Sequence, residues 1–415
     1  MPIQRRHPTG GPDGAQDRAR DKAGPEIGEH NPWTIGWEER PWDPADGRMS
    51  GRYRAALVPA IADLKVRVDD DATVAATGAV AEIARFDTDI DVRFAPFASL
   101  LLRSESAASS QIEQLTARAK AILMAEAGDT SRRNATIIAS NTGAMNAALA
   151  LADNPSTAAI IEMHRALLEA SNPRIVGQWR DEQVWIGGRR PSPHDAEFVP
   201  PHHSRVPEGM EDLVAFMRRN DLDPFIQAMV AHAQFETIHP FPDGNGRTGR
   251  ALIHAHLRQT GVTRHVIVPI SAGLLADTRH YFDALGAYRD GDVSPVVALA
   301  ADAAHRAIDN GRQLAADVDH ISASWRGATA KVRSHSVLHR IVAELPSHPV
   351  LDIAGVEERF GVSNPAASRA VWQLVELGVL SRANAGLRFR KFIAHDIADA
   401  LDRFADRVGR RSTPR

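Results

Sequence analysis

The stretch HPFPDGNGRTGR, from His239 to Arg250, combines a histidine, a carboxylate, glycines and two arginines within twelve residues. Glycines let consecutive backbone N–H groups turn toward one point, and the N-terminus of the helix expected to follow adds its positive dipole end. Arg247 and Arg250 are three residues apart, so both lie on one face of that helix. Two guanidinium groups beside such an anion nest favour a polyphosphate ligand.

Two further side chains of this stretch extend the phosphate chemistry. Asp243 would repel a phosphate unless a cation lies between them, and Mg²⁺ held by one carboxylate and substrate phosphates is the usual arrangement. His239 titrates near neutrality, so it can accept a proton from a hydroxyl that attacks phosphorus. The chain has no cysteine, no Walker A sequence and no HEXXH motif, which argues against a thiolate zinc site, a P-loop and a zinc protease.

The same stretch resembles, at every defined position, the signature HxFx(D/E)GNGRxxR of Fic-domain proteins. Upstream, GQWRDEQVWIGG and AEFVPPH resemble the flap of that family. The resemblance covers about residues 50–390. It implies a mainly α protein, with a Fic-type helical core and a β-hairpin flap, that transfers AMP from ATP to a Ser, Thr or Tyr hydroxyl of a target protein or of itself.

The resemblance also implies a role for each residue of the loop. His239 is expected to be the general base, Asp243 to hold Mg²⁺, and Phe241 to anchor the loop in the core. Arg247 is expected near the β-phosphate and Arg250 at the γ-phosphate. The remaining phosphate contacts are expected from Gly244, Asn245 and Gly246. A target segment would pair with the flap backbone, at Val184, Trp185, Ile186, Gly187 and Gly188. A nucleotide-base pocket is expected near Tyr281 and Phe282.

A second motif predicts that the loop is restrained. Ser109 and Glu113 are four residues apart and are expected to share one helix face. The segment from Ser109 to Gln114 resembles the inhibitory motif (S/T)xxxE(G/N) of many Fic proteins, whose glutamate pairs with the last arginine of the loop. Glu113 would then occupy the Arg250 guanidinium group that the γ-phosphate needs. Gln114 departs from the usual Gly or Asn, and a solvated surface glutamate is the alternative interpretation.

Helical periodicity surrounds these motifs. Apolar residues recur at intervals of three and four, in 53–127, 134–152, 157–170, 206–220, 224–238, 245–260, 280–292 and 295–318. Asp223 and Pro224 are a typical N-cap and first helical residue, and Gly261 is a typical helix stop. The helix after Asp223 is expected to bury one stripe, formed by Phe225, Ile226, Met229, Val230 and Ala233. The only strands expected before the C-terminal region are two in the flap, near Gln183–Ile186 and Ala196–Val199.

The C-terminal region changes organisation at about Ser334. Helices are expected over 335–345, 354–361 and 364–380, followed by two short strands around 384–386 and a final helix over 395–408. This is the element order of a winged helix-turn-helix domain. Residues 331–415 carry 14 Lys and Arg against 9 Asp and Glu. DNA binding is one interpretation, through Arg369, Arg382, Arg388, Arg390 and Lys391. Protein contact or packing is the other.

Length and composition set the remaining limits. A chain of 415 residues favours several domains. We expect a disordered tail (1–30), an N-terminal helical region with the inhibitory helix (31–127), the Fic catalytic core (128–325), and the winged helix with the terminal helix (331–415). The N-terminal sequence has no secretory h-region and no long apolar run exists, so no membrane segment and a cytoplasmic location are expected. A homodimer is expected by analogy with the family.

Several interpretations stay open beside AMP transfer. The same loop can serve transfer of UMP, phosphocholine or phosphate, although the γ-phosphate arginine favours AMP. Family members with an inhibitory glutamate also run the reverse reaction, which removes AMP. A DNA-binding regulator is an interpretation of a different class. Trp33, Trp37 and Trp42 indicate an arm that packs on the body or docks a partner.

Overall fold

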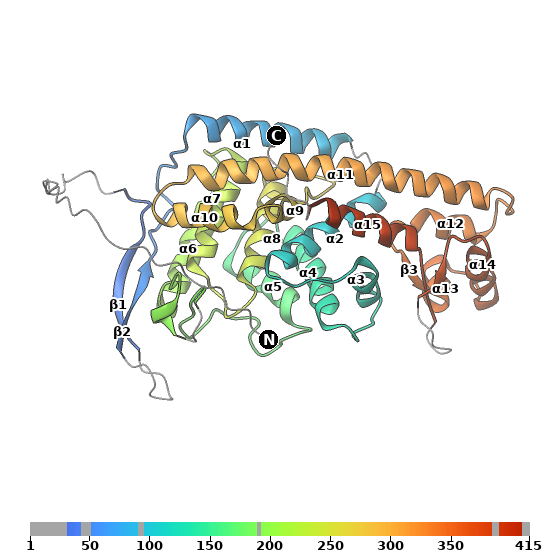
Figure 1. The fold of residues 1–415 in the computed structure, drawn as a ribbon, viewed down its shortest axis with the longest axis horizontal. Coiled ribbons are helices and arrows are strands. Elements are labelled where there is room, and N and C mark those ends of the chain that lie inside the picture. The colour runs from blue at the N-terminus through green and yellow to red at the C-terminus, as the bar shows by residue number, and fades with distance from the viewer. Residues whose placement is uncertain (1–30, 43–50, 90–94, 189–191, 384–389, 409–415) are drawn as a thin grey trace, which may run out of the picture.

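The computed structural model describes residues 31–42, 51–89, 95–188, 192–383 and 390–408. They form an elongated, mainly helical molecule with a β-hairpin at one end and a small mixed module at the other (Figure 1). The expected tail, residues 1–30, lies outside the described residues. Among the described residues, no helix combines the length and the apolar composition that a bilayer-spanning segment needs.

The N-terminal hairpin was not predicted. β1 (Gly36–Trp42) pairs antiparallel with β2 (Gly51–Leu57), so the helix expected from Tyr53 onward is wrong there. The sequence GRYRAAL lacks β-branched residues and therefore gives no strand signal by composition. Residues 58–69 are irregular. Trp33 is buried and its Nε1 donates to the Lys65 carbonyl at 3.2 Å, whereas Trp37 remains 41% exposed.

The helical body follows the predicted periodicity from Asp70 onward. Its helices are α1 (Asp70–Asp89), α2 (Ala95–Ile112), α3 (Ala119–Glu126), α4 (Arg133–Ala150), α5 (Thr157–Leu168), α6 (Val206–Met217), α7 (Pro224–Ile238), α8 (Asn245–Gln259), α9 (Ile270–Leu275), α10 (Thr278–Arg289) and α11 (Ser294–Thr329). α9 was not predicted, and α11 is longer than predicted. α11 runs along α1 and reaches the C-terminal module (Figure 1).

α7 lies within the body, and the loop that begins at His239 follows its C-terminal end. Asp223 caps it, because its Oδ1 accepts from the backbone N–H groups of Phe225 and Ile226 at 2.9 and 3.0 Å. Every residue from Phe225 to Ile238 is buried, so the predicted single stripe was too narrow. A helix surrounded on all sides buries its polar residues too. Gln234, for example, accepts from Tyr288 and donates to Pro59.

The C-terminal module has the element order predicted for a winged helix. It comprises α12 (Val337–Glu344), β3 (Val350–Asp352), α13 (Ile353–Phe360), α14 (Asn364–Glu376), β4 (Ser381–Arg382) and β5 (Lys391–Ile393). β5 is the central strand of an antiparallel sheet with the order β3-β5-β4, and β3 was not predicted. The expected tip of the wing, with Arg388, lies in residues 384–389, outside the described residues. The last helix of the module, α15 (His395–Val408), packs back on α2, α3 and α11.

Candidate active site

The loop between α7 and α8 is held in one conformation by its own residues. His239 ends α7 with a left-handed φ of 52°, and Gly244 begins α8 with a φ of 81°. Phe241 is fully buried. The Asn245 side chain closes the loop: its Oδ1 accepts from Phe241 N at 2.9 Å and its Nδ2 donates to Phe241 O at 2.7 Å. The Asn245 side chain is thus committed to both polar backbone groups of Phe241, and its backbone N–H is left for a phosphate.

Two residues that were not predicted, His164 and Trp179, pack against Phe241 and so support the loop. The His164 ring, from α5, stacks on Phe241 with 3.7 Å between ring centroids. Burial lowers the pKa of His164 to about 4, so the ring is neutral near pH 7. Its Nε2 then donates to the Asp243 carbonyl at 3.0 Å. Trp179 packs on the same phenyl ring, with centroids 5.0 Å apart.

Arg180 is a third missed residue, and its hydrogen bonds hold the backbone on both sides of the site. Its side chain is buried. Its Nε donates to the His239 carbonyl at 2.8 Å, Nη1 to the Glu182 carbonyl at 2.9 Å and Nη2 to the Pro201 carbonyl at 2.5 Å. Arg180 thus ties the left-handed residue His239 to both arms of the flap. Because all its acceptors are backbone carbonyls, the side-chain types in the sequence do not predict this role.

Replacement of Arg180 by lysine is expected to lower the free energy of unfolding by about 2–3 kcal/mol, because one ammonium group cannot satisfy three separated carbonyls and buried acceptors are left unpaired. Chemical denaturation measures the change. Arg174→Lys, at an exposed position six residues earlier, is the matched control and is expected to be neutral. Equal stability of the two variants would contradict the assigned contacts.

The structure brings Ser109, Glu113 and Arg250 together. Arg250, on α8, is 1% exposed. Its Nε donates to Ser109 Oγ at 2.9 Å, and its Nη2 donates to Ser109 O at 2.8 Å and to Glu113 Oε1 at 2.9 Å. The Glu113 side chain is 40% exposed, so its desolvation is partial; desolvation opposes ionisation of the carboxyl, but the Arg250 guanidinium group outweighs it and lowers the pKa of Glu113. The pair is therefore ionised at neutral pH.

Glu113 also lies against the N-terminal turn of α8. A Cβ placed on Gly246 would meet Glu113 Oε1 at 2.0 Å and Arg250 Nη1 at 2.9 Å. Only glycine at this position lets the carboxylate come so close to the backbone. The carboxylate thus occupies the anion-binding end of α8, where backbone N–H groups and the helix dipole favour negative charge.

Arg247 keeps unused donors beside that carboxylate. The side chain is 4% exposed, and its Nε and Nη1 have no hydrogen-bond partner among the described residues. Its Nη2 lies 3.6 Å from Oδ1 of Asp243, whose side chain is 61% exposed. Buried donors without partners are rare in folded proteins. They indicate that the site is built for a further anion.

A magnesium ion fits this donor set only together with a ligand. No group of three or more His, Asp or Glu side chains that could hold a metal occurs in the part of the chain that the structure describes. Asp243 offers one carboxylate at the edge of the anion nest. Mg²⁺ is usually bound by one or two carboxylates, waters and substrate phosphates. The site therefore suits an ion that arrives with a polyphosphate.

The His239 ring is in the form that can accept a proton. Burial, reinforced by the charge of Arg180, lowers the pKa of His239 to about 4, so the imidazole is neutral at pH 7. Its Nδ1 has no partner among the described residues. Glu236, one helical turn earlier on α7, was not predicted as a site residue. Burial raises the pKa of its carboxyl to about 7 against the opposing charge of Arg250.

The two residues predicted for a base pocket lie in different surroundings. Tyr281 is 2% exposed, and its hydroxyl lies 2.8 Å from Nε2 of His232. Phe282 is 55% exposed. Tyr281 is therefore part of the packed wall behind Arg250, and Phe282 is at the surface. Their contact with a nucleotide base stays a prediction.

The turn that carries Glu113 differs from the prediction. α2 ends at Ile112, so Ser109 and Glu113 do not share a helix face; Glu113 lies in the turn beyond it. Gln114 takes a left-handed φ of 61°, and Leu115 N donates to Ser110 O at 3.0 Å. This is a Schellman-type helix end, whose left-handed position favours glycine and asparagine. The geometry gives a physical reason for the usual Gly or Asn at the position of Gln114.

Replacement of Gln114 by glycine is expected to raise the free energy of unfolding by about 0.5–1 kcal/mol. The left-handed conformation costs a residue with a Cβ about 1–2 kcal/mol, and the greater freedom of glycine in the unfolded chain offsets part of the gain. Thermal and urea denaturation measure it. Gln111→Gly, inside α2, is the control, with an expected loss of about 1 kcal/mol. Destabilisation by both changes would contradict the assigned turn.

The flap forms less sheet than predicted. The two expected strands reduce to a single bridge between Ile186 and Phe198. Pairing stops there because Gly187 and Gly188 take φ values of 72° and 90°, and a Cβ on Gly188 would lie 2.4 Å from the Asp195 carbonyl oxygen. Val184 and Trp185 precede the bridge and are partly buried.

The flap packs against the N-terminal hairpin, which was not predicted. Ala56 N, in β2, donates to Val199 O at 3.1 Å. The rings of Trp42 and Trp185 meet edge to face with centroids 5.5 Å apart. The hairpin therefore packs against the flap and supports it from one side.

Comparison with known proteins agrees with this geometry. Residues 154–257 match the model of the Fic/DOC family. The protein adenylyltransferase Fic of Drosophila mojavensis is 31% identical over 160 residues, which are 36% of this chain and 28% of that protein. The one of Aedes aegypti is 33% identical over 152 residues, 36% of this chain and 28% of that protein. The chain thus spans less than a third of the length of these relatives.

Solved structures give a more distant likeness. A Fic family protein from Desulfovibrio desulfuricans G20 is 19% identical, with a TM-score of 0.49 over 79% of this chain and 97% of that one. Fic-1 from Caenorhabditis elegans is 21% identical, with a TM-score of 0.42 over 58% of this chain and 73% of that one.

The segment that matches the family model contains the whole loop from His239 to Arg250, the residues that the geometry above gathers at one site. It also contains their missed supports, His164 and Arg180. Residues 154–257 of the chain are therefore a Fic/DOC-type domain.

Proposed function

We propose that this chain is a protein adenylyltransferase, which transfers AMP from ATP to a Ser, Thr or Tyr hydroxyl of a target protein and of itself. The observation that carries the proposal is a neutral histidine, His239, beside an anion nest with the unpaired donors of Arg247. The names of the relatives support AMP as the transferred group.

In this reaction the hydroxyl oxygen forms a bond to the α-phosphorus, and the bond between that phosphorus and the bridging oxygen of pyrophosphate breaks. His239 accepts the hydroxyl proton. Backbone N–H groups at Gly244, Asn245 and Gly246 and the unpaired N–H groups of Arg247 bind the phosphates. Asp243 would hold Mg²⁺, which neutralises phosphate charge when bound. The flap backbone near Ile186 would align the target segment.

The proposal includes self-inhibition. Glu113 holds the Arg250 guanidinium group at 2.9 Å and lies at the anion-binding end of α8. A γ-phosphate needs the same guanidinium group, so ATP binds productively only when Glu113 moves away. The N-terminal region (31–127) then acts as the restraint on a catalytic core (128–325).

Intact-mass analysis tests the function. The purified chain is incubated with ATP and Mg²⁺, with EDTA in a parallel sample, and the Glu113→Gly variant is included. A mass increase of one AMP less water, lost in EDTA, supports the proposal. An increase that corresponds to one phosphate, or incorporation from UTP in place of ATP, would contradict AMP transfer.

A second function, DNA binding, is favoured by one surface of the C-terminal module (331–415). Arg369 is exposed on α14. Arg382 is exposed on β4 and lies 4.8 Å from the centroid of the Trp372 ring. We propose that these cations contact phosphates of duplex DNA. A salt-dependent shift of duplex DNA by the full chain supports this, and no shift at low salt contradicts it.

A further inference from the structure

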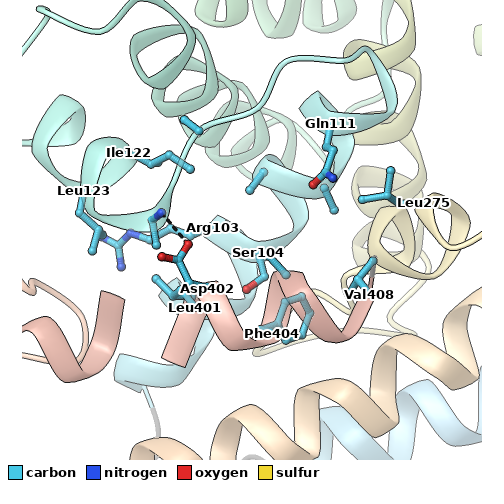
Figure 2. Close-up of a pocket in the computed structure, with 15 residues that line it drawn as sticks. Arg103, Ser104, Gln111, Ile122, Leu123, Leu275, Leu401, Asp402, Phe404 and Val408 are labelled. Atoms are coloured by element: carbon cyan, nitrogen blue, oxygen red, sulfur yellow. Dashed lines mark hydrogen bonds between the residues drawn. The ribbon is translucent and has the colours of Figure 1, made fainter. Parts of the chain in front are cut away.

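α3 lies between the inhibitory turn and the C-terminal module. It starts at Ala119, a short segment after Glu113. Its N-cap residue, Arg118, gives no side-chain cap. The cap comes from the far end of the chain instead: Asp402 Oδ1, on α15, accepts from Ala119 N at 2.9 Å (Figure 2). A carboxylate at this position satisfies an orphan N–H group and complements the helix dipole.

The other end of α3 is held by the same module. Lys391, in β5, donates from Nζ to the carbonyl of Ala127, the C-cap residue of α3. An ammonium group there complements the negative end of the helix dipole. α15 begins two residues after β5 ends. One continuous stretch of the C-terminal module therefore holds α3 at both of its ends.

The junction of α2, α3 and α15 is incompletely filled. It leaves a partly open pocket of about 50 Å³, whose walls are mainly apolar and include Ile122, Leu123, Leu401 and Phe404. Ser104, on α2, also lines it (Figure 2), and its buried Oγ has no hydrogen-bond partner among the described residues. Tight packing resists displacement, and a cavity weakens that resistance. The position of α3 therefore depends more on the polar contacts at its two ends than it would in a tightly packed junction.

We propose that Asp402 is a positioning residue for the inhibitory glutamate. By fixing the start of α3, it fixes the segment that follows Glu113 and so keeps the Glu113 carboxylate on Arg250. The C-terminal module then sets how firmly the active site is restrained. This inference rests on the proposed adenylyltransferase function and its self-inhibition.

Asp402→Ala is expected to raise auto-AMPylation about fivefold, the ratio that corresponds to the loss of one helix cap. Asp402→Asn keeps an acceptor oxygen and is expected to stay near the wild-type rate. The matched control is Asp406→Ala: Asp406 lies on the same helix and 3.9 Å from Arg118 but does not cap α3. Rates are measured from labelled ATP, and thermal unfolding is followed for each variant.

The decisive comparison repeats Asp402→Ala in the Glu113→Gly background. If Asp402 acts through Glu113, the double variant incorporates AMP no faster than Glu113→Gly alone. An equal rise in both backgrounds, or no rise in the wild-type background, overturns the inference. If Asp402→Ala does not fold, Lys391→Met loosens the other end of α3 with the same expected pattern.

The outcomes separate this inference from the function on which it rests. If Glu113→Gly itself incorporates no AMP, the proposed function fails. If Glu113→Gly is active while both Asp402→Ala and Lys391→Met stay at the wild-type rate, only the role of the C-terminal module fails.

Discussion

Replacement of Glu113 by glycine is expected to raise auto-AMPylation about tenfold to a hundredfold. The change removes one charge-assisted hydrogen bond, from Arg250 Nη2 to Glu113 Oε1 at 2.9 Å. Such a bond contributes about 1.5–3 kcal/mol, and 1.4 kcal/mol is a factor of ten in a population. The change also clears the anion-binding end of α8, which Gly246 leaves open. Incorporation of label from α-labelled ATP measures the rate.

The control for this variant is Glu169→Gly, an identical change at an exposed position at the end of α5. It should leave the rate unchanged. Because the folded-state pKa of Glu113 is lowered, the ion pair persists through neutral pH and is lost only as the pH falls through that lowered pKa. The ratio of variant to wild-type rate should therefore be constant between about pH 6 and 8. Equal rates in variant and wild type would remove Glu113 as the restraint.

The loop could be predicted from sequence because its chemistry is local. His239, Asp243 and Arg250 lie on one short segment, and glycine, a helix start and three-residue spacing have direct geometric consequences. Glu113 and Arg250 are far apart in the sequence, so the spacing of residues could not predict that they pair. The pairing could be predicted only because the segment from Ser109 to Gln114 resembles a known motif.

The missed parts share a physical cause. Arg180 donates hydrogen bonds to backbone carbonyl groups. His164 stacks on Phe241 and donates one hydrogen bond to a backbone carbonyl group. Such partners are set by tertiary placement, so side-chain types in the sequence do not indicate them. The N-terminal hairpin was missed because the β2 sequence contains alanines and no β-branched residue. Its strands are stabilised by contact with the flap, including the contact between Trp42 of the hairpin and Trp185 of the flap.

Two buried arginines at the site, Arg247 and Arg250, carry positive charge that Glu113 helps to neutralise. Arg247 lacks partners for two nitrogen atoms, and Arg250 is fully buried with Glu113 as its ion-pair partner. Unpaired buried cations are costly. We therefore expect either the glutamate or an anionic ligand to occupy the end of α8, and a ligand that competes with Glu113 would shift the balance between the two.

Replacement of His239 by alanine, in the Glu113→Gly background, is expected to lower AMP transfer about 10²–10⁴-fold, the usual contribution of a general base. Nucleotide affinity, measured by calorimetry, should change little, because the proposed phosphate contacts come from the first turn of α8, including Arg247. Since burial lowers the pKa of His239 to about 4, the neutral ring dominates above that pH and becomes protonated below it. Transfer by the parent variant should thus fall only as the pH drops through about 4.

A structural effect of the same change must be separated from a chemical one. His239 has a left-handed φ of 52°, which alanine tolerates poorly and asparagine tolerates better. His239→Asn should therefore keep the fold of the loop and still lose transfer, whereas His280→Ala, at a side chain that is 72% exposed, should keep full activity. Retained transfer in the asparagine variant would show that another group accepts the proton. Glu236, whose carboxyl has a pKa raised to about 7 by burial, would then be a candidate for that role.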